Sequence, residues 1–357
     1  MQNIIKPNEI YMPDKKSSAA SKNTKTKQVY LITGATSGLG VELIKQLIND
    51  SNQIRVIVKD DFLVNPEWKN LPSGVIPYIS NMTFPSSKDS LSLEEACRNV
   101  DVVIHIAGAS YNYKTSLNQL IDANVKVTEN LLKTIARVNK NRRVHFIFAS
   151  SITVYGYKTK LQKITESSEL HPGSPYSNTK MMAEQIIRSF SEVNQNIKYT
   201  ILRYATFYGP HYEDPSFFKI FDLIKSQKMY YIGTSSNHLS FVHVDDAVGA
   251  IIAVLNNLDK AANQIYNVTD GQPYTPKYLF EKIAEILNVP PPKKVININM
   301  AKLLVKLFNI NFDEFQFLTS DRIIDISKIK KDLGFVPKNR LDVQGLDMIK
   351  HYLSYKK

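Results

Sequence analysis

The sequence predicts an α/β protein in which a doubly wound, parallel β-sheet carries a smaller, interleaved C-terminal part. Between Gln28 and Tyr204, short runs rich in Val and Ile alternate with stretches of helical periodicity. These runs are continuously apolar, which is typical of parallel strands covered on both faces. A glycine-rich turn follows the first run directly and leads into a helical pattern.

The elements follow in a regular order up to Arg203. We expect the strands to be QVYLIT, IRVIV, VIPYI, VDVVIHIA, VHFIFA and YTILRY. The helices between them include VELIKQLIND, a helix from about Ser116 to Asn139, and a helix that Ser174 caps and Pro175 begins. After Arg203 the pattern weakens into the loop YGPHYEDPS, a helix near 217–225, a strand end with a helix in FVHVDDAVGAIIAVL, and a proline-punctuated C-terminal third.

This order predicts three parts. Residues 1–27 read as a flexible basic tail rich in Lys, Ser and Asn. Residues 28–204 form the nucleotide-binding domain, to which residues 240–267 return. Residues 205–239 and 268–357 form a smaller lid that contains the substrate site.

Composition excludes several classes of protein. The chain has 357 residues, 43% of them hydrophobic, which is enough for a large core. Its one cysteine, Cys97, excludes a disulfide framework and a cysteine zinc cluster, and it fits the cytoplasm. The sequence contains no apolar run of about 18 residues, so it predicts no membrane-spanning helix. The net charge of +12 is diffuse, which favours a small anionic ligand over nucleic acid.

The turn TGATSGLG, residues 33–40, is the first motif that carries chemistry. Its glycines allow a tight turn, so that free amides at the start of the next helix can hold a pyrophosphate. Strand two ends at Val58, and Lys59 follows where an NAD enzyme carries an acidic residue for the ribose. A cation there, with Ser37 as a hydroxyl donor, favours the 2′-phosphate of NADP. NAD stays open because Asp60 comes next, and a merely solvated Lys59 is the alternative.

A second group of residues lies on later elements. His105 stands inside an apolar strand, where a core histidine is the expected role, and no neighbouring ligand suggests a metal site. Tyr176 and Lys180 are four residues apart, so they share one helix face. Ser151 ends the fifth strand, 25 residues before Tyr176. Such a Tyr and Lys pair is weak evidence alone, because many helices contain one by chance.

The complete set of motifs resembles the extended short-chain dehydrogenase/reductase superfamily, the NAD-dependent epimerase/dehydratase family. The motifs are TGATSGLG, VIHIAGA, ANVKVTENLL, FASSITVYG, SPYSNTK, LRYATFYGP, SFVHVDDAVGA, IYNVTDGQPYT and ISKIKKDLGFVP, in the expected order from Gln28 to the C-terminus. In character the chain is closest to the branch of 3β-hydroxysteroid dehydrogenases and dihydroflavonol reductases. The resemblance implies a Rossmann sheet, an NAD(P) cofactor and a small-molecule substrate, and it leaves a homodimer open.

The resemblance also implies residue roles. Tyr176 is the catalytic acid/base, Lys180 contacts the nicotinamide ribose and acidifies Tyr176, Ser151 holds the substrate oxygen, and Asn124 supports the lysine through water. Asn81 stands where the family usually has an aspartate facing the adenine. The positions that the resemblance assigns to the cofactor are Gly34, Ser37, Gly38, Leu39, Gly40, Lys59, Asn81, Met82, Ala107, Gly108, Tyr176, Lys180 and Tyr204.

Besides Asn81, three positions depart from the family pattern. Ser37 stands where extended members usually have the second glycine of the turn. Thr206 replaces an asparagine, and Leu239 replaces an arginine that holds the sugar diphosphate in nucleotide-sugar enzymes.

These departures favour hydride transfer between nicotinamide and a secondary alcohol or ketone. A nucleotide-sugar epimerase is the alternative, and a redox-silent nucleotide-binding scaffold is a weaker one. A 4,6-dehydratase needs a carboxylate pair beside the serine, where Ile152 and Thr153 stand. The apolar segment from Met300 is expected to cover the substrate pocket rather than to touch a membrane.

Overall fold

The computed structural model describes residues 27–49, 51–59, 74–83, 86–109, 115–157, 162–209, 215–307 and 312–355. Apart from Lys27, the predicted tail lies outside the described residues, and so does Asp60.

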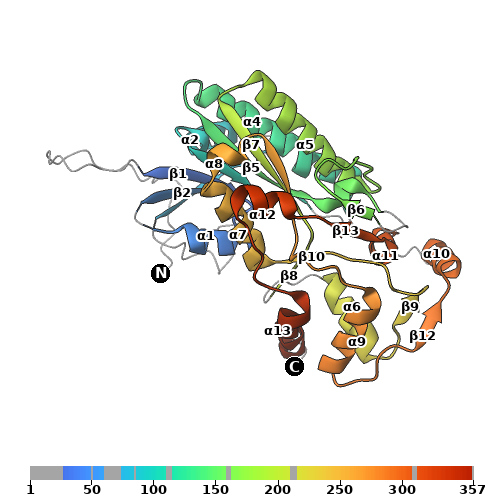
Figure 1. Cartoon of the computed structure of the whole chain (residues 1–357). Coiled ribbons are helices and arrows are strands. Elements are labelled where there is room, and N and C mark those ends of the chain that lie inside the picture. The colour runs from blue at the N-terminus through green and yellow to red at the C-terminus, as the bar shows by residue number, and fades with distance from the viewer. Residues whose placement is uncertain are drawn as a thin grey trace, which may run out of the picture.

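Seven parallel strands form the central sheet, which confirms the predicted fold class (Figure 1). Their order is β11-β7-β5-β4-β1-β2-β3. Successive strands are added on one side of β1 up to β3 and on its other side from β4 onward, so the strand order reverses between β1 and β4. In sheets of this kind ligands bind at that point, beyond the carboxyl ends of the strands. The strands are β1 (Gln28–Thr33), β2 (Asn52–Val58), β3 (Val75–Ile79), β4 (Val102–His105), β5 (Val144–Ser151), β7 (Ile197–Tyr204) and β11 (Gln264–Val268).

Helices cover both faces of this sheet (Figure 1). On one face α1 (Gly38–Leu47) packs against α7 (Val244–Leu255). On the other face α4 (Val127–Val138) packs against α2 (Ser87–Cys97) and α5 (Pro175–Val193). Two separate apolar clusters fill the two interfaces, because each strand buries alternate side chains on opposite faces.

The helix predicted from Ser116 to Asn139 is interrupted. It consists of α3 (Leu117–Ile121), a π-helical turn over Asp122–Lys126, and α4. Single π-turns within helices occur often at functional sites. Asn124 lies in this turn.

The C-terminal part packs around its own apolar cluster, which includes Tyr208, Phe221 and Tyr352. Its helices are α6 (Pro215–Lys225), α9 (Pro276–Ile286), α10 (Ile298–Leu307), α11 (Phe312–Thr319) and α13 (Leu341–Tyr355). Two short helices, α8 (Leu258–Ala261) and α12 (Ser327–Leu333), contact each other, and α12 also contacts β11. Three two-stranded parallel sheets complete it: β8 (Thr206–Tyr208) with β10 (Phe241–His243), β9 (Tyr230–Ile232) with β12 (Lys294–Ile296), and β6 (Gln162–Ile164) with β13 (Arg322–Ile324). The assignment of this part as a substrate domain stays a prediction.

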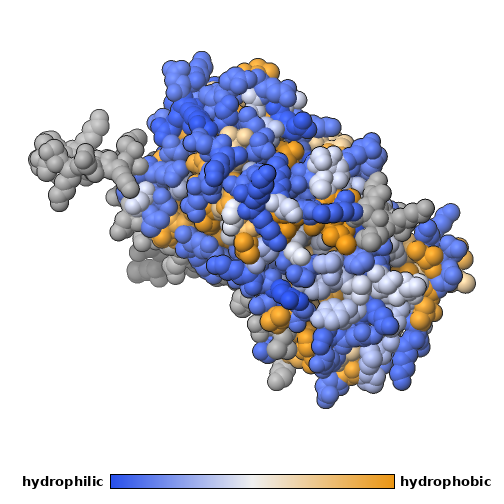
Figure 2. Space-filling view, viewed as in Figure 1, coloured by the Kyte–Doolittle hydropathy of each residue, from blue (hydrophilic) through white to orange (hydrophobic). Residues whose placement is uncertain are grey.

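The apolar segment from Met300 is partly buried and partly exposed. It forms α10, at the far end of the C-terminal part (Figure 1). Met300, Leu303 and Leu307 are 52%, 50% and 66% exposed, and apolar surface is visible at this end in Figure 2. These three side chains face outward, whereas Ala301 and Val305 of the same helix pack with Phe315. The role of this segment as a cover of the substrate pocket stays a prediction. Among the described residues, no helix is long and apolar enough to cross a bilayer.

Candidate active site

The glycine turn packs tightly against the end of β4. Gly34 has a φ of +75°, and a Cβ atom there would lie 2.6 Å from the backbone nitrogen of Ala107. At Gly40, a Cβ atom would lie 2.3 Å from the carbonyl oxygen of Gly34. Only glycine fits both positions, so this turn can approach a ligand closely. Of the next predicted positions, Gly38 is exposed and Leu39 is buried in the core, so Leu39 can present only its backbone.

Ser37 has a structural role that the sequence did not reveal. Its hydroxyl accepts a hydrogen bond from the Gly40 amide (3.1 Å) and donates one to the Gly34 carbonyl (2.8 Å), so it caps α1. The single hydroxyl proton is thus already used within the turn. A donation from Ser37 to a 2′-phosphate, which would require this hydrogen bond to be given up, stays a prediction. Lys59 is exposed directly after β2.

Two predicted adenine-side residues follow β3. Asn81 is exposed; its amide donates to Asp89 Oδ1 (2.9 Å), and its own Oδ1 accepts from the Thr83 amide (3.1 Å). Met82 packs at the edge of the core, and its carbonyl accepts from Asn130 Nδ2 (2.9 Å). The Asn81 side chain is therefore on the surface at the correct end of the sheet.

Tyr176 and Lys180 lie at the beginning of α5, where a capping box formed by Ser174 and Ser177 starts the helix with Pro175 in its first turn. Lys180 is only 4% exposed. Its Nζ donates to the carbonyl of Ala149 on β5 (2.8 Å) and lies 6.0 Å from the centre of the Tyr176 ring. The helix face that the sequence predicted thus points at the carboxyl end of β5.

Burial shifts the pKa of both ionisable groups of this pair. Burial raises the pKa of Tyr176 to about 12, and a hydrogen bond with Ser151 opposes this rise. Burial lowers the pKa of Lys180 to about 8. In the chain without ligand, desolvation therefore disfavours the phenolate. The acidification of Tyr176 by Lys180, together with the nicotinamide cation, stays a prediction.

Ser151 is arranged as a donor. Its Oγ accepts hydrogen bonds from the Thr153 hydroxyl (2.9 Å) and the Thr153 amide (3.2 Å). A serine hydroxyl has two acceptor positions and one proton. With both acceptor positions used, the proton of Ser151 is directed to Tyr176 or to a substrate oxygen.

Asn124 holds the end of the β4 loop. Its Oδ1 accepts from the Ala109 amide (2.8 Å), and its Nδ2 donates to the Ala109 carbonyl (3.1 Å) and to Thr179 Oγ1 (3.0 Å). A Cβ atom on Gly108 would lie 2.7 Å from Asn124 Oδ1 and 3.4 Å from Lys180 Nζ. A side chain at 108 would thus fill the space beside the lysine. The water-mediated support of Lys180 by Asn124 stays a prediction.

His105 is a core residue, as predicted. Its ring nitrogens lie 2.6 Å from Thr33 Oγ1 and 2.9 Å from Thr128 Oγ1, and the Thr128 hydroxyl donates to the Asn124 carbonyl (2.7 Å). Because that proton is used, His105 Nε2 donates and Nδ1 accepts. Burial lowers the pKa of His105 to about 3, so the ring is neutral. No group of three or more His, Cys, Asp or Glu suited to a metal occurs in the described ranges.

Tyr204 lies in the packed core, and Leu239 and Thr206, which depart from the family pattern, lie in the C-terminal part. Tyr204 is 2% exposed, and its hydroxyl donates to the Ala247 carbonyl (3.1 Å), so its side chain belongs to the core. Leu239 is 3% exposed in the C-terminal apolar cluster, and its backbone pairs with Tyr274. A diphosphate therefore finds no polar contact at this side chain. Thr206 is half-buried in β8.

The sequence analysis missed a buried ion pair next to the site. Arg203 Nη2 lies 2.6 Å from Glu184 Oε2, and each side chain is 2% exposed. Ser150 also donates to Glu184 (2.5 Å). Glu184 follows Lys180 by four residues, and this spacing was the available signal. Its charge opposes the fall in the pKa of Lys180.

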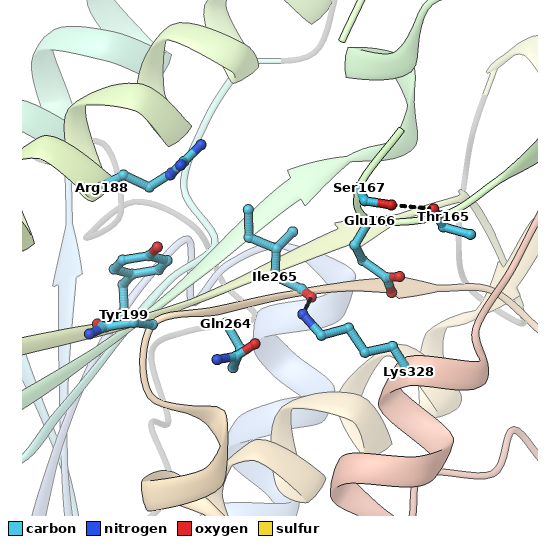
Figure 3. A pocket seen from close by; sticks show the side chains of 9 residues that line it. Thr165, Glu166, Ser167, Arg188, Tyr199, Gln264, Ile265 and Lys328 are labelled. Atoms are coloured by element: carbon cyan, nitrogen blue, oxygen red, sulfur yellow. Dashed lines mark hydrogen bonds between the residues drawn. The ribbon is translucent and has the colours of Figure 1, made fainter. Parts of the chain in front are cut away.

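A separate pocket of about 480 Å³ lies near β11, away from the predicted residues (Figure 3). Lys328 Nζ donates there to the Ile265 carbonyl (2.9 Å). The pocket is lined by Thr165, Glu166, Ser167, Arg188, Tyr199, Asn263, Gln264, Ile265 and Lys328. None of the predicted catalytic or cofactor residues lines it.

A family model and several curated proteins match most of this chain. The NAD dependent epimerase/dehydratase family matches residues 30–269. An uncharacterized UDP-glucose epimerase, YtcB, of Bacillus subtilis is 26% identical over 91% of this chain and 97% of its own length. UDP-glucose 4-epimerase of Vibrio cholerae is 26% identical (87% and 91%), and short-chain dehydrogenase/reductase family 42E member 1 of Danio rerio is 28% identical (87% and 84%).

Solved structures share the fold. The UDP-glucuronic acid 4-epimerase of Bacillus cereus in complex with NAD has a TM-score of 0.72 and 20% identity, covering 92% of this chain and 100% of that one. UDP-glucose 4-epimerase of Thermotoga maritima with UDP-glucose has a TM-score of 0.69 and 22% identity, with the same coverage.

Proposed function

Because the chain belongs to the NAD dependent epimerase/dehydratase family, we propose that it is an NAD-dependent epimerase of nucleotide sugars with Tyr176 as acid/base. One observation carries this proposal. Ser151, Tyr176 and Lys180 converge at the carboxyl end of β5, near the loop after β4 against which the glycine turn packs, in a chain whose similarity to the epimerases of Bacillus subtilis and Vibrio cholerae extends through the C-terminal part. This proposal replaces the secondary-alcohol dehydrogenase as our first choice.

The residues present fit an NAD cofactor. The turn at Gly34 and Gly40 leaves room only for backbone, and the start of α1 offers amides to a pyrophosphate. Lys180, beside which Gly108 places backbone and no side chain, is suited to the nicotinamide ribose. Bound NAD would accept a hydride from the substrate and return it. We propose NAD over NADP because the Ser37 hydroxyl is already used and the Bacillus cereus structure contains NAD.

The chain's own residues would handle the proton. Tyr176 takes the proton of the sugar hydroxyl as the carbon loses its hydride, and gives it back when the hydride returns to the other face. The positive charge of the oxidised nicotinamide adds to that of Lys180 and opposes the burial that raises the pKa of Tyr176. Ser151 donates its proton to the same oxygen and stabilises the ketone that forms.

A dehydrogenase of secondary alcohols is the second candidate, and Leu239 favours it. The leucine is buried in an apolar cluster where nucleotide-sugar enzymes place an arginine. A dehydratase is disfavoured, because Ile152 and Thr153 provide no carboxylate beside Ser151.

The test separates the two candidates by the amount of NADH that accumulates for each molecule of product. Purified protein is incubated with UDP-glucose, UDP-galactose and their uronic acid forms, and the products are separated by chromatography, with Tyr176→Phe as the inactive control. Interconversion without net NADH supports the epimerase. If secondary alcohols yield NADH in proportion to product while no nucleotide sugar is converted, the dehydrogenase is correct instead.

A further inference from the structure

Arg322 is a buried cation without a carboxylate partner among the described residues. The side chain lies on β13 and is 3% exposed. Its Nη1 donates to the carbonyl of Gly156 and lies 3.5 Å from that of Ile152. Its guanidinium carbon lies 4.9 Å from the centre of the Tyr157 ring. The arginine Arg203, by contrast, is fully paired with Glu184.

Half of the guanidinium has no described partner. An arginine has five N–H donors, and the Nε and Nη2 edge presents the fork that matches a carboxylate. Neither Nε nor Nη2 of Arg322 makes a hydrogen bond within the described part of the chain, and neither is sealed from solvent. Burying an uncompensated charge costs several kcal/mol. Two carbonyls and one aromatic ring offset only part of that cost.

Arg322 lies against the turn that follows Ser151. The carbonyls it contacts belong to residues at the two ends of the turn that follows Ser151 (Ile152 to Gly156). Its guanidinium also lies over the ring of Tyr157, the residue that directly follows Gly156. These contacts place Arg322 against the turn that leads away from Ser151, the residue proposed to hold the sugar oxygen.

We propose that Arg322 binds a carboxylate carried by the sugar, so that the preferred substrate is a nucleotide-linked sugar acid. This inference rests on the proposed function and adds the substrate class to it. The carboxylate supplies the counter-charge that the described residues do not, and two parallel hydrogen bonds to Nε and Nη2 would fix the orientation of the ring.

The diphosphate of the substrate is the competing anion. The sugar that reacts with Tyr176 must lie beside Ser151, and the diphosphate is attached at the far side of that ring. Arg322 contacts the turn that begins directly after Ser151. The geometry thus favours an anion on the sugar itself.

The experiment measures binding of UDP, UDP-glucose and UDP-glucuronic acid to the NAD-loaded full-length protein by calorimetry. The variants are Arg322→Gln and Arg322→Lys, with Arg340→Gln as a control, because Arg340 is 52% exposed and, unlike Arg322, pairs with a carboxylate, that of Asp342. One bidentate charged contact predicts that wild type prefers UDP-glucuronic acid over UDP-glucose by about 10- to 100-fold. Arg322→Gln should remove this preference and leave the affinities for UDP and UDP-glucose within about threefold.

Arg322→Lys keeps the charge without the fork, and we expect it to lose most of the preference. If Arg322→Gln does not fold, this variant supplies the answer. Equal binding of the two sugars by wild type overturns the inference but not the proposed function. An equal loss for UDP shows that the diphosphate is the ligand and also overturns it. If neither sugar nor UDP binds, the proposed function fails, and the inference fails with it.

Discussion

Replacing Lys180 with methionine should change how stability depends on pH. In the folded chain burial lowers the pKa of this ammonium from 10.5 to about 8. Between these two values the unfolded chain binds a proton that the folded chain does not, so wild type gains stability as pH rises. From pH 7 to pH 10 the gain is roughly 2 to 3 kcal/mol. Lys180→Met lacks the ionisable group and therefore lacks this gain.

The assay is urea unfolding of both proteins at pH 7 and pH 10, followed by circular dichroism. The quantity of interest is the difference between wild type and Lys180→Met, because ionisations common to both proteins cancel. Lys45→Met is the control, since Lys45 is 64% exposed, and it should show no such trend. A difference that stays constant within about 0.5 kcal/mol would refute the reasoning, because it would mean that Lys180 is not desolvated in the folded chain.

Three further predictions concern the cofactor and the chemistry. Tyr176→Phe should abolish turnover and leave NAD affinity within a few-fold, because the ring still packs but carries no proton; activity within tenfold of wild type in the epimerase assay would contradict this role. Lys59→Asp should leave the preference for NADH over NADPH unchanged or increase it, measured as two dissociation constants at one ionic strength; tighter wild-type binding of NADPH would restore the assignment to NADP. Gly34→Ala should lower the free energy of unfolding by about 1 to 3 kcal/mol and weaken NAD binding, because its Cβ meets the Ala107 backbone; unchanged melting and affinity would show that the turn can relax.

Much of the sheet, and the Tyr176 and Lys180 pair of the site, could be predicted from patterns of neighbouring residues in the sequence. Continuous Val and Ile runs, the turn at residues 33–40 and the cap at Ser174 each specify their own backbone through neighbouring residues. Tyr176 and Lys180 share a helix face by spacing alone, and the structure places that face at the end of β5. The family resemblance added Ser151 and Asn124, which no spacing rule provides.

Other features depend on contacts between distant parts of the chain. The outward face of α10 and the buried position of Leu239 are set by which surfaces the C-terminal part covers. The capping role of Ser37 follows from the exact turn geometry.

The sequence by itself determined the strands, the helices and the residue types that the chemistry requires, because these are written in periodicity and spacing. Only the tertiary structure decided the charge state of the site. Desolvation acts on Tyr176 and Lys180 in opposite directions, and it depends on everything that packs around them. The same holds for Arg322, which meets Ile152 across 170 positions of the chain, a contact that depends on how β13 pairs with β6 and that no local pattern encodes.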